Sequence, residues 1–288
     1  TMSAMLDSAD GAVKVRDLEV EGAAGPLAAR LYTAHDAAAT TAKKDMLVVF
    51  FHGGGFDSGD LQKADDFLRS LAECDHYPAV LASTYTLATV SPFPAAVEDA
   101  HAVLAWAKKN KTKLGWNGKY LVASGIEAGA NLAAVCALMS RDRGGPALAG
   151  QILIMPMLDP ALSTGSMRQM TLCADREKAA TECAAAYRGY LPHAADRSHP
   201  YAAPLHSSRL KNLAPALILS AEDDPLRDEA EQYGSKLINS GVCTTVRRMP
   251  PADLDLQDPN GRNVCACKVH AMDEITSFLS GLEKRKGA

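Results

Sequence analysis

Apolar residues recur along this chain in two rhythms that alternate from one segment to the next. Near the amino terminus, residues 13–20 and 28–32 alternate apolar and polar positions on either side of a turn at 22–25, which predicts a hairpin of two half-exposed strands. Residues 46–51 (MLVVFF) are then continuously apolar, as is typical of a strand buried on both faces in a parallel sheet. The hairpin strands are therefore expected to be half-exposed and the apolar strand to be buried on both faces.

From residue 61 onward, segments with helical spacing of apolar residues alternate with short apolar runs. The helix-like segments are 61–74, 94–110, 128 onward, 224–240 and 264–282, and the strand-like ones are 79–83, 120–124, 151–155, 216–220 and 244–249. This order of elements predicts an α/β fold with a mainly parallel sheet and right-handed crossovers.

Residues 160–210 interrupt this order between two predicted core strands. They hold no long apolar strand, and their clearest feature is a helix-like stretch at 176–190. An insert of about fifty residues at this point typically forms a cap over the carboxyl edge of the sheet, where ligands of such folds bind. We therefore expect a single domain over residues 1–288 with an inserted cap region at 160–210.

A sharp turn between a strand and a helix lies near the centre of the chain. Residues 119–134 read KYLVASGIEAGANLAA, in which an apolar strand precedes Gly125 and helical spacing begins at Ala128. In a nucleophile elbow of the G-x-S-x-G kind, the glycines let the backbone bend sharply and hold the central side chain above the sheet. Here Gly125 and Gly129 are in place, but the central residue is Glu127 and not serine.

A second strand end carries a glycine triplet. The strand at 46–51 runs into HGGGF at 52–56, and three successive glycines leave backbone N–H groups free to converge on an anion. We expect His52 to support this loop through a hydrogen bond of its ring and not to act as a base.

Composition narrows the classes of function. The chain of 288 residues is 47% hydrophobic with a formal net charge of −4, which fits one large α/β domain and offers no basic stripe for nucleic acid. The longest apolar runs are too short to span a bilayer, and residues 1–11 lack the features of a signal peptide, so a cytoplasmic protein is expected. Seven scattered cysteines favour reduced thiols. Cys265 and Cys267 have no second Cys/His pair nearby, so neither a metal nor another cofactor is predicted.

Four stretches resemble the hormone-sensitive-lipase family of esterases, which has the α/β-hydrolase fold. They are HGGGF at 52–56 with SGD at 58–60, PFPAA at 92–96 with Asp99 and Ala100, GIEAGANL at 125–132, and DPLRDE at 224–229. The resemblance implies a mostly parallel, eight-stranded sheet flanked by helices, a small helical cap, and hydrolysis of the carboxylesterase or lipase type. Members of the family often dimerise through the last strand and helix, so a homodimer is among the partners that the resemblance implies.

The family hydrolyses esters with a Ser-Asp-His triad and an oxyanion hole. Carried over, the hole consists of Gly53, Gly54, Gly55 and Ala128, the serine position is Glu127, and the acid position is Asp224. The family's histidine follows the last strand in a G-M-x-H-G-F-like loop, which here reads RMPPAD at 248–253 and contains no histidine. The nearest downstream histidine, His270, falls inside the final predicted helix.

Several of these residues also have structural interpretations. Asp224 followed by Pro225 is typical of a helix N-cap with proline at the first helical position. The three histidines of the predicted cap region are interpreted as solvated or locally bonded; they are His193, His199 and His206.

Without the serine and the histidine, the resemblance leaves two main hypotheses. The first is a pseudoenzyme that has lost serine-esterase activity and binds an unidentified small molecule or a protein partner through the inherited pocket. The alternative is a hydrolase or lyase of altered chemistry that uses Glu127 as general base or nucleophile. Because a helix amino terminus favours an anion, we expect the Glu127 carboxylate to be ionised, to reach the Gly53–Gly55 strip and to fill the oxyanion site.

Overall fold

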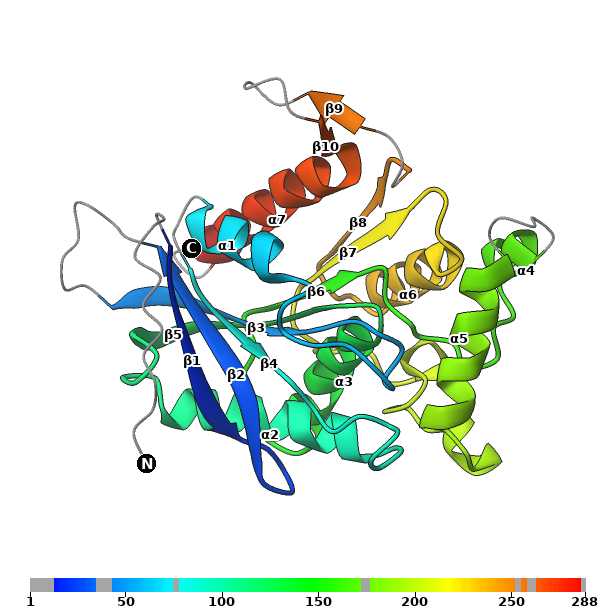
Figure 1. Ribbon diagram of the computed structural model, residues 1–288, viewed down its shortest axis with the longest axis horizontal. Helices are drawn as coiled ribbons and strands as arrows, with labels where there is room; N and C mark the ends of the chain where they lie inside the picture. Colours follow the sequence, from blue (N-terminus) through cyan, green and yellow to red (C-terminus); the bar gives the residue numbers. More distant parts are fainter. Residues whose placement is uncertain are drawn as a thin grey trace.

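A central sheet of eight strands organises the computed structural model, which describes residues 13–34, 43–74, 78–171, 177–251, 255–257 and 263–285 (Figure 1). In sheet order the strands are β1 (Val13–Glu21), β2 (Pro26–Ala34), β4 (Ala79–Ser83), β3 (Lys44–Phe51), β5 (Trp116–Ile126), β6 (Gly150–Ile154), β7 (Ala216–Ala221) and β8 (Thr244–Met249). The hairpin β1-β2 is antiparallel, β2 pairs antiparallel with β4, and each later neighbouring pair is parallel. The predicted hairpin and mainly parallel sheet are confirmed, and the hairpin lies at the edge of the sheet.

Helices cover both faces of this sheet. One face packs against α2 (Ala95–Lys109), α3 (Ala128–Asp142) and α6 (Arg227–Asn239), and the other against α1 (Asp65–Glu73) and α7 (Ala266–Arg285), as Figure 1 shows. Successive side chains of a strand point to opposite faces. In β3, Leu47 and Val49 therefore enter the core with α2 and α3, whereas Val48 and Phe50 enter the core with α1 and α7.

Several boundaries differ from the sequence prediction. Strand β5 begins at Trp116, before the predicted start at 120, because Trp116 pairs with Lys44 ahead of an irregularity in the β3-β5 register. Beyond β8, a two-stranded ribbon of β9 (Asp255–Gln257) and β10 (Asn263–Cys265) precedes α7. Residues 252 and 253 of the RMPPAD stretch, and the side chains of Cys265 and Cys267, lie outside the described residues.

The segment between β6 and β7 lies beside the carboxyl edge of the sheet. It contains α4 (Gly165–Thr171), α5 (Glu177–Tyr190) and two 3₁₀ turns, Ala194–Ser198 and Pro204–His206. The Tyr190 ring stacks on Phe56 with 3.8 Å between ring centroids, and the Tyr190 carbonyl accepts a hydrogen bond from the Phe93 N–H. Helix α5 is thereby held over the loop that carries the glycine triplet; the boundaries 160–210 of a cap region stay a prediction.

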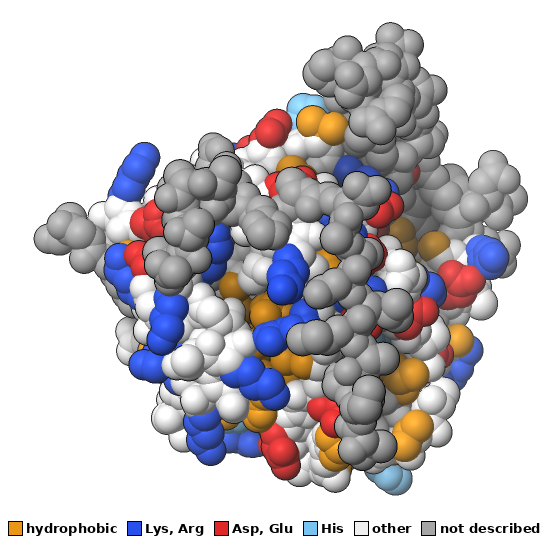
Figure 2. All heavy atoms as spheres, turned by 60° about the vertical axis from the view of Figure 1, so that its left-hand side comes forward, with side chains coloured by type: hydrophobic (Ala, Val, Ile, Leu, Met, Phe, Trp, Pro, Cys, Tyr) orange, Lys and Arg blue, Asp and Glu red, His pale blue; other side chains and the backbone are white. Residues whose placement is uncertain are grey.

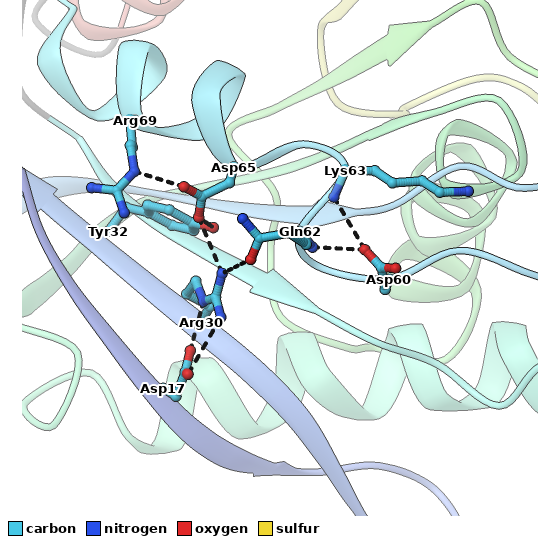
Figure 3. Close-up of polar contacts among 8 residues, drawn as sticks. All are labelled: Asp17, Arg30, Tyr32, Asp60, Gln62, Lys63, Asp65 and Arg69. Carbon is cyan, nitrogen blue, oxygen red and sulfur yellow. Dashed lines mark hydrogen bonds and ion pairs between the residues drawn. The ribbon is translucent and has the colours of Figure 1, made fainter. Parts of the chain in front are cut away.

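A polar network fastens the hairpin to α1, which follows the glycine loop (Figure 3). Its centre is the buried carboxylate of Asp65, which accepts hydrogen bonds from the Tyr32 hydroxyl at 2.8 Å, Arg69 Nε at 2.7 Å and Arg30 Nη1 at 3.1 Å. Arg30 also donates through Nε to Asp17 at 2.6 Å. Because Asp65 is the first residue of α1, the network fixes the end of the loop that positions the site.

Candidate functional site

Glu127 stands at a strained turn between β5 and α3. Its backbone angles are φ 52° and ψ −115°, a region that a residue other than glycine occupies only when its surroundings impose it. The flanking glycines make the turn feasible, since a Cβ on Gly125 would lie 2.3 Å from Gly129 and a Cβ on Gly129 would lie 2.0 Å from the Phe51 carbonyl oxygen. The turn thus has the geometry of the predicted nucleophile elbow.

Backbone hydrogen bonds tie this elbow to the end of β6. The Glu127 N–H donates to the Ile154 carbonyl at 3.0 Å, and the Glu127 carbonyl accepts from the Met157 N–H at 3.2 Å. The buried amide of Asn131 donates to the Met157 carbonyl at 2.7 Å and to the Ala202 carbonyl at 3.2 Å. These hydrogen bonds hold the turn from several sides, and such support keeps Glu127 in its strained backbone conformation.

The Glu127 carboxylate lies against the glycine strip. Its Oε2 accepts a hydrogen bond from the Gly54 N–H at 3.0 Å, and a Cβ on Gly53 would lie 2.9 Å from the same oxygen. In the described part of the chain, neither Oε1 nor the N–H groups of Gly53, Gly55 and Ala128 take part in a hydrogen bond of this carboxylate. The expected contact between Glu127 and the strip is therefore present, with one of the predicted donors.

His52 supports the glycine loop in the predicted way. Its Nδ1 lies 2.8 Å from the Gly53 carbonyl oxygen, and its ring stacks on Tyr85 at 4.4 Å between centroids. The Tyr85 hydroxyl donates to the His52 carbonyl at 3.0 Å. Burial lowers the pKa of His52, so the ring is neutral and Nδ1 carries the proton that it donates to Gly53.

Asp224 has a different local role from the expected N-cap. Helix α6 begins at Arg227 with Leu226 at the N-cap position, because the Arg227 N–H first closes a turn with the Asp224 carbonyl. The Asp224 carboxylate instead accepts the Leu226 N–H at 2.6 Å. Burial, together with the charges of Glu127 and Asp223, raises the pKa of Asp224 to about 6. The acid position and the serine position therefore lie close enough for their charges to interact.

The described histidines make no hydrogen bond to Glu127 or Asp224. His206 Nε2 lies 2.9 Å from Oδ1 of the buried Asp159, and His199 Nδ1 accepts the Tyr201 N–H at 3.1 Å. These two are locally bonded, as interpreted from the sequence, while His193 and His270 are exposed.

Two functional groups near the elbow were not predicted from the sequence. Glu229 of α6 is fully buried; its Oε1 accepts the Leu158 N–H at 2.8 Å, and its Oε2 has no partner in the described residues. Burial raises the pKa of Glu229 well above its usual value, with the charges of Asp159 and Asp224 adding to the effect. Glu229 follows charged neighbours in the sequence, so no local pattern marks it as buried.

The other group is the thiol of Cys183 on α5. Burial, followed by the charges of Glu229, Asp224 and Glu127, raises its pKa to about 12. The thiolate is the reactive form of cysteine, so this thiol is not an activated nucleophile at neutral pH. The Cys183 shift also shows that the electric field around the elbow is dominated by carboxyl groups.

Space above the strip is narrow. A Cβ on Gly55 would lie 2.8 Å from the Ala186 Cβ of α5. Two surface hollows of the described part lie elsewhere: about 400 Å³ beside α6, and about 460 Å³ beside the end of α3 and residues 198–209. Neither is lined by Glu127 or the glycine strip.

Among the described residues, no group of three or more His, Cys, Asp or Glu side chains is placed to hold a metal ion. None of the helices formed by the described residues has the length and apolar character of a membrane span.

A mostly parallel sheet with a strained elbow facing a glycine strip defines an α/β hydrolase. Residues 48–253 match the family model described as alpha/beta hydrolase fold, and the chain belongs to this family, in its hormone-sensitive-lipase-like group of esterases and lipases. It is 34% identical over 239 residues to "Esterase LipI" of Mycobacterium tuberculosis, covering 81% of this chain and 72% of that protein. It is 36% identical to "Carboxylic ester hydrolase LipN" of the same organism, covering 82% and 62%.

Solved structures agree with this assignment. An esterase from Pyrobaculum calidifontis superimposes with a TM-score of 0.75 at 38% identity, covering 82% of this chain and 75% of that chain. The carboxylesterase EstE1 from a metagenomic library superimposes with a TM-score of 0.81 at 29% identity, covering 93% and 89%.

Proposed function

We propose that this protein is an esterase-like α/β hydrolase that has lost serine-type ester hydrolysis and binds a small molecule through the inherited pocket. The observation that carries the proposal is the position of the Glu127 Oε2 atom, 3.0 Å from the Gly54 N–H. In an esterase of this fold, that N–H belongs to the donors that stabilise the oxyanion of the tetrahedral intermediate. Here the Glu127 side chain accepts that N–H in the resting protein.

Serine-type hydrolysis requires a hydroxyl nucleophile, a base that takes its proton, and an oxyanion hole that is free when the intermediate forms. Glu127 removes the first and occupies one donor of the third, the Gly54 N–H. By resemblance of the RMPPAD stretch to the family's loop, Pro251 stands where the family has its histidine. Loss of triad members typically lowers the rate about a millionfold, and leaves about 10³-fold over water from the hole and binding. With one hole donor occupied as well, we expect turnover near background.

The ligand class follows from the family and from the local chemistry. The relatives carry names of ester hydrolases, and a ligand of this pocket would be a small ester or a molecule of similar shape. It would bind beside the half-buried Glu127 carboxylate at the carboxyl edge of the sheet.

Two measurements test the proposal together. A panel of short p-nitrophenyl esters should show no turnover above buffer, and native mass spectrometry of the purified protein should reveal a bound small molecule. Turnover of any ester that depends on Glu127 would contradict the loss of activity. An unliganded spectrum, together with no shift in melting temperature on addition of non-hydrolysable ester analogues, would contradict ligand binding.

A second candidate function rests on the other carboxylate oxygen. Glu127 is half-buried, and its Oε1 has no hydrogen-bond partner among the described residues, so this oxygen is available as a base or a nucleophile. A nucleophilic Glu127 would form a covalent ester with an alkylating substrate such as an epoxide. Without a histidine to promote its hydrolysis, that ester would accumulate as a mass adduct, absent in Glu127→Gln.

A further inference from the structure

Basic side chains gather at the end of the molecule opposite Glu127. Five lysines lie between Lys108 and Lys119 without an intervening acid, in the last turn of α2, the following loop and the beginning of β5. Lys43 and Lys44 lie at the beginning of β3, whereas Glu127 follows the end of the parallel strand β5. The lysines therefore surround the amino ends of the strands. Figure 2, which brings the left-hand side of Figure 1 forward, shows many Lys and Arg side chains on this face.

Hydrogen bonds hold the segments of this basic face together. Arg16 Nη2 of β1 donates to the Lys113 carbonyl at 2.8 Å, and Lys43 Nζ lies 3.4 Å from Thr112 Oγ1. The Lys44 N–H donates to the Gly115 carbonyl at 2.8 Å. The basic face, defined as Arg16, Lys43, Lys44 and the five lysines of 108–119, is thus one surface built from four segments of the chain.

Among the described residues, Asp45 forms an ion pair with Lys119 of this face at 2.9 Å. Lys109 and Lys111 are exposed and form no ion pair with another described residue. Because the whole chain has a formal net charge of −4, the charge of the folded molecule is strongly polarised. Such a face attracts polyanions over a Debye length of about 8–10 Å.

Aromatic rings lie beneath two of the ammonium groups. Lys113 Nζ lies 5.2 Å from the ring centroid of the half-buried Trp106, and Lys108 Nζ lies 5.2 Å from that of Trp116, which is fully buried. The rings are covered, so they offer no open platform on which a nucleic-acid base could stack. A half-buried tryptophan beneath a lysine is instead a composition found at membrane interfaces.

We propose that the basic face docks this protein on the surface of an anionic phospholipid bilayer. Lysine ammoniums are compact point charges on flexible stems and suit a diffuse layer of headgroup charges, whereas phosphate recognition in nucleic acids favours arginine forks and stacking. The guanidinium of this face, Arg16, is engaged with the Lys113 carbonyl. Docked in this way, the protein presents the elbow edge of the sheet to the aqueous phase.

The test is co-sedimentation of the full chain with vesicles of phosphatidylcholine alone and of phosphatidylcholine mixed with phosphatidylglycerol. We expect binding to the mixed vesicles only, weakening at least tenfold when the ionic strength rises from about 0.05 M to about 0.5 M. Lys109→Glu with Lys111→Glu should abolish it without changing the melting temperature, because both side chains are exposed and unbonded. The matched control is Lys63→Glu with Arg188→Glu, which makes the same charge change on exposed side chains near the glycine loop and on α5 and should bind like the parent.

Three results would overturn the proposal. Equal binding to neutral vesicles would show that the attraction is not to headgroup charge. Equal loss in the two double variants would show that net charge acts, and not this face. Retention of a single-stranded or duplex oligonucleotide in the absence of vesicle binding would assign the face to nucleic acid.

Discussion

The Glu127 Oε2 atom accepts the Gly54 N–H at 3.0 Å, and the two residues are 73 positions apart in the chain. This bond joins the elbow after β5 to the glycine strip after β3, the two places where an esterase of this fold assembles its oxyanion hole. The donor that a hydrolase keeps for the transient oxyanion here contacts a side chain of the resting protein. On the proposed function, the same side chain therefore affects both the stability of the protein and its capacity for ester hydrolysis.

Removal of this carboxylate should destabilise the protein. Glu127→Ala deprives the Gly54 N–H of its acceptor, and a hydrogen bond of this kind at a half-buried site contributes about 1 kcal/mol, or about 2–4 °C in melting temperature. Glu127→Gln retains an oxygen acceptor without the charge and should lie between parent and alanine variant. Thermal unfolding near neutral pH measures the effect, with Glu222→Ala as a control on an exposed acid. Parental stability in both Glu127 variants would refute the bond's contribution.

Asp224 should make the stability of the protein fall as pH rises. Its pKa is about 6 in the folded chain and about 3.9 when unfolded, so the folded state binds more protons between these values. The penalty therefore develops from about pH 4 to pH 6 and persists above. Asp224→Asn keeps an acceptor for the Leu226 N–H and should be more stable than the parent by about 1–2 kcal/mol at pH 8, after allowance for partial exposure.

The control for Asp224→Asn is the same pair of melting curves below pH 4, where both side chains are neutral and the difference should vanish. An asparagine variant that is less stable than the parent at pH 8 would show that the Asp224 charge is favourably bound. In Glu127→Gln, the loss of a neighbouring charge should lower the pKa of Asp224, which a carboxyl-carbon NMR titration would detect.

Glu229 should tolerate an amide but not truncation. Because burial raises its pKa well above the usual value, folding favours the protonated side chain, which resembles glutamine. Glu229→Gln keeps an acceptor for the Leu158 N–H and should cost less than about 1 kcal/mol, whereas Glu229→Ala leaves a cavity and an unpaired N–H and should cost about 2–4 kcal/mol. Denaturant unfolding distinguishes these values.

The pH dependence of the Glu229 variants supplies an independent check. A carboxyl group with a raised folded pKa lowers stability as pH rises from its unfolded pKa of about 4.3 toward its folded pKa. Glu229→Gln should therefore gain stability relative to the parent on the alkaline side. An unchanged difference between pH 5 and pH 9 would indicate that Glu229 is already ionised in the fold.

Much of the fold follows from local pattern. The continuous apolar strand at 46–51 and the turn around Gly125 and Gly129 each have a short-range signature, and the structure contains both as predicted. The hole residues Gly53, Gly54, Gly55 and Ala128 were placed by resemblance, and of these the Gly54 N–H contacts the Glu127 side chain. Their role toward a ligand stays a prediction.

Contacts between residues that are far apart in the sequence cannot be predicted from the local pattern of apolar and polar residues. Burial of Glu229 comes from packing of α6 against the segment after β6, and the His206–Asp159 bond joins residues 47 positions apart. The basic face combines segments from β1, β3 and the loop after α2, so a formal net charge of −4 conceals it. In each instance, the neighbours are set by the sheet order, which a single sequence specifies only indirectly.

Restoration of the serine alone should not restore hydrolysis. In Glu127→Ser, the hydroxyl lacks a base that would take its proton, so it stays a weak nucleophile. By resemblance, Pro251 stands at the position of the family's histidine, and combination of Glu127→Ser with Pro251→His would supply the full set of triad residues proposed with Asp224. Stopped assays with p-nitrophenyl acetate should show background rates for each single variant, and any gain should require both substitutions. Activity in Glu127→Ser alone would reveal another base.

The most direct test of the account is the rate at which the unmodified protein hydrolyses p-nitrophenyl acetate and butyrate, with and without a serine-directed organophosphate. Because Glu127 occupies the Gly54 N–H of the predicted anion site and stands at the serine position, we predict a rate equal to that of buffer in both conditions and no organophosphate adduct by intact mass. Turnover well above buffer that the organophosphate abolishes would contradict the account, since it would require a functional serine nucleophile in this chain.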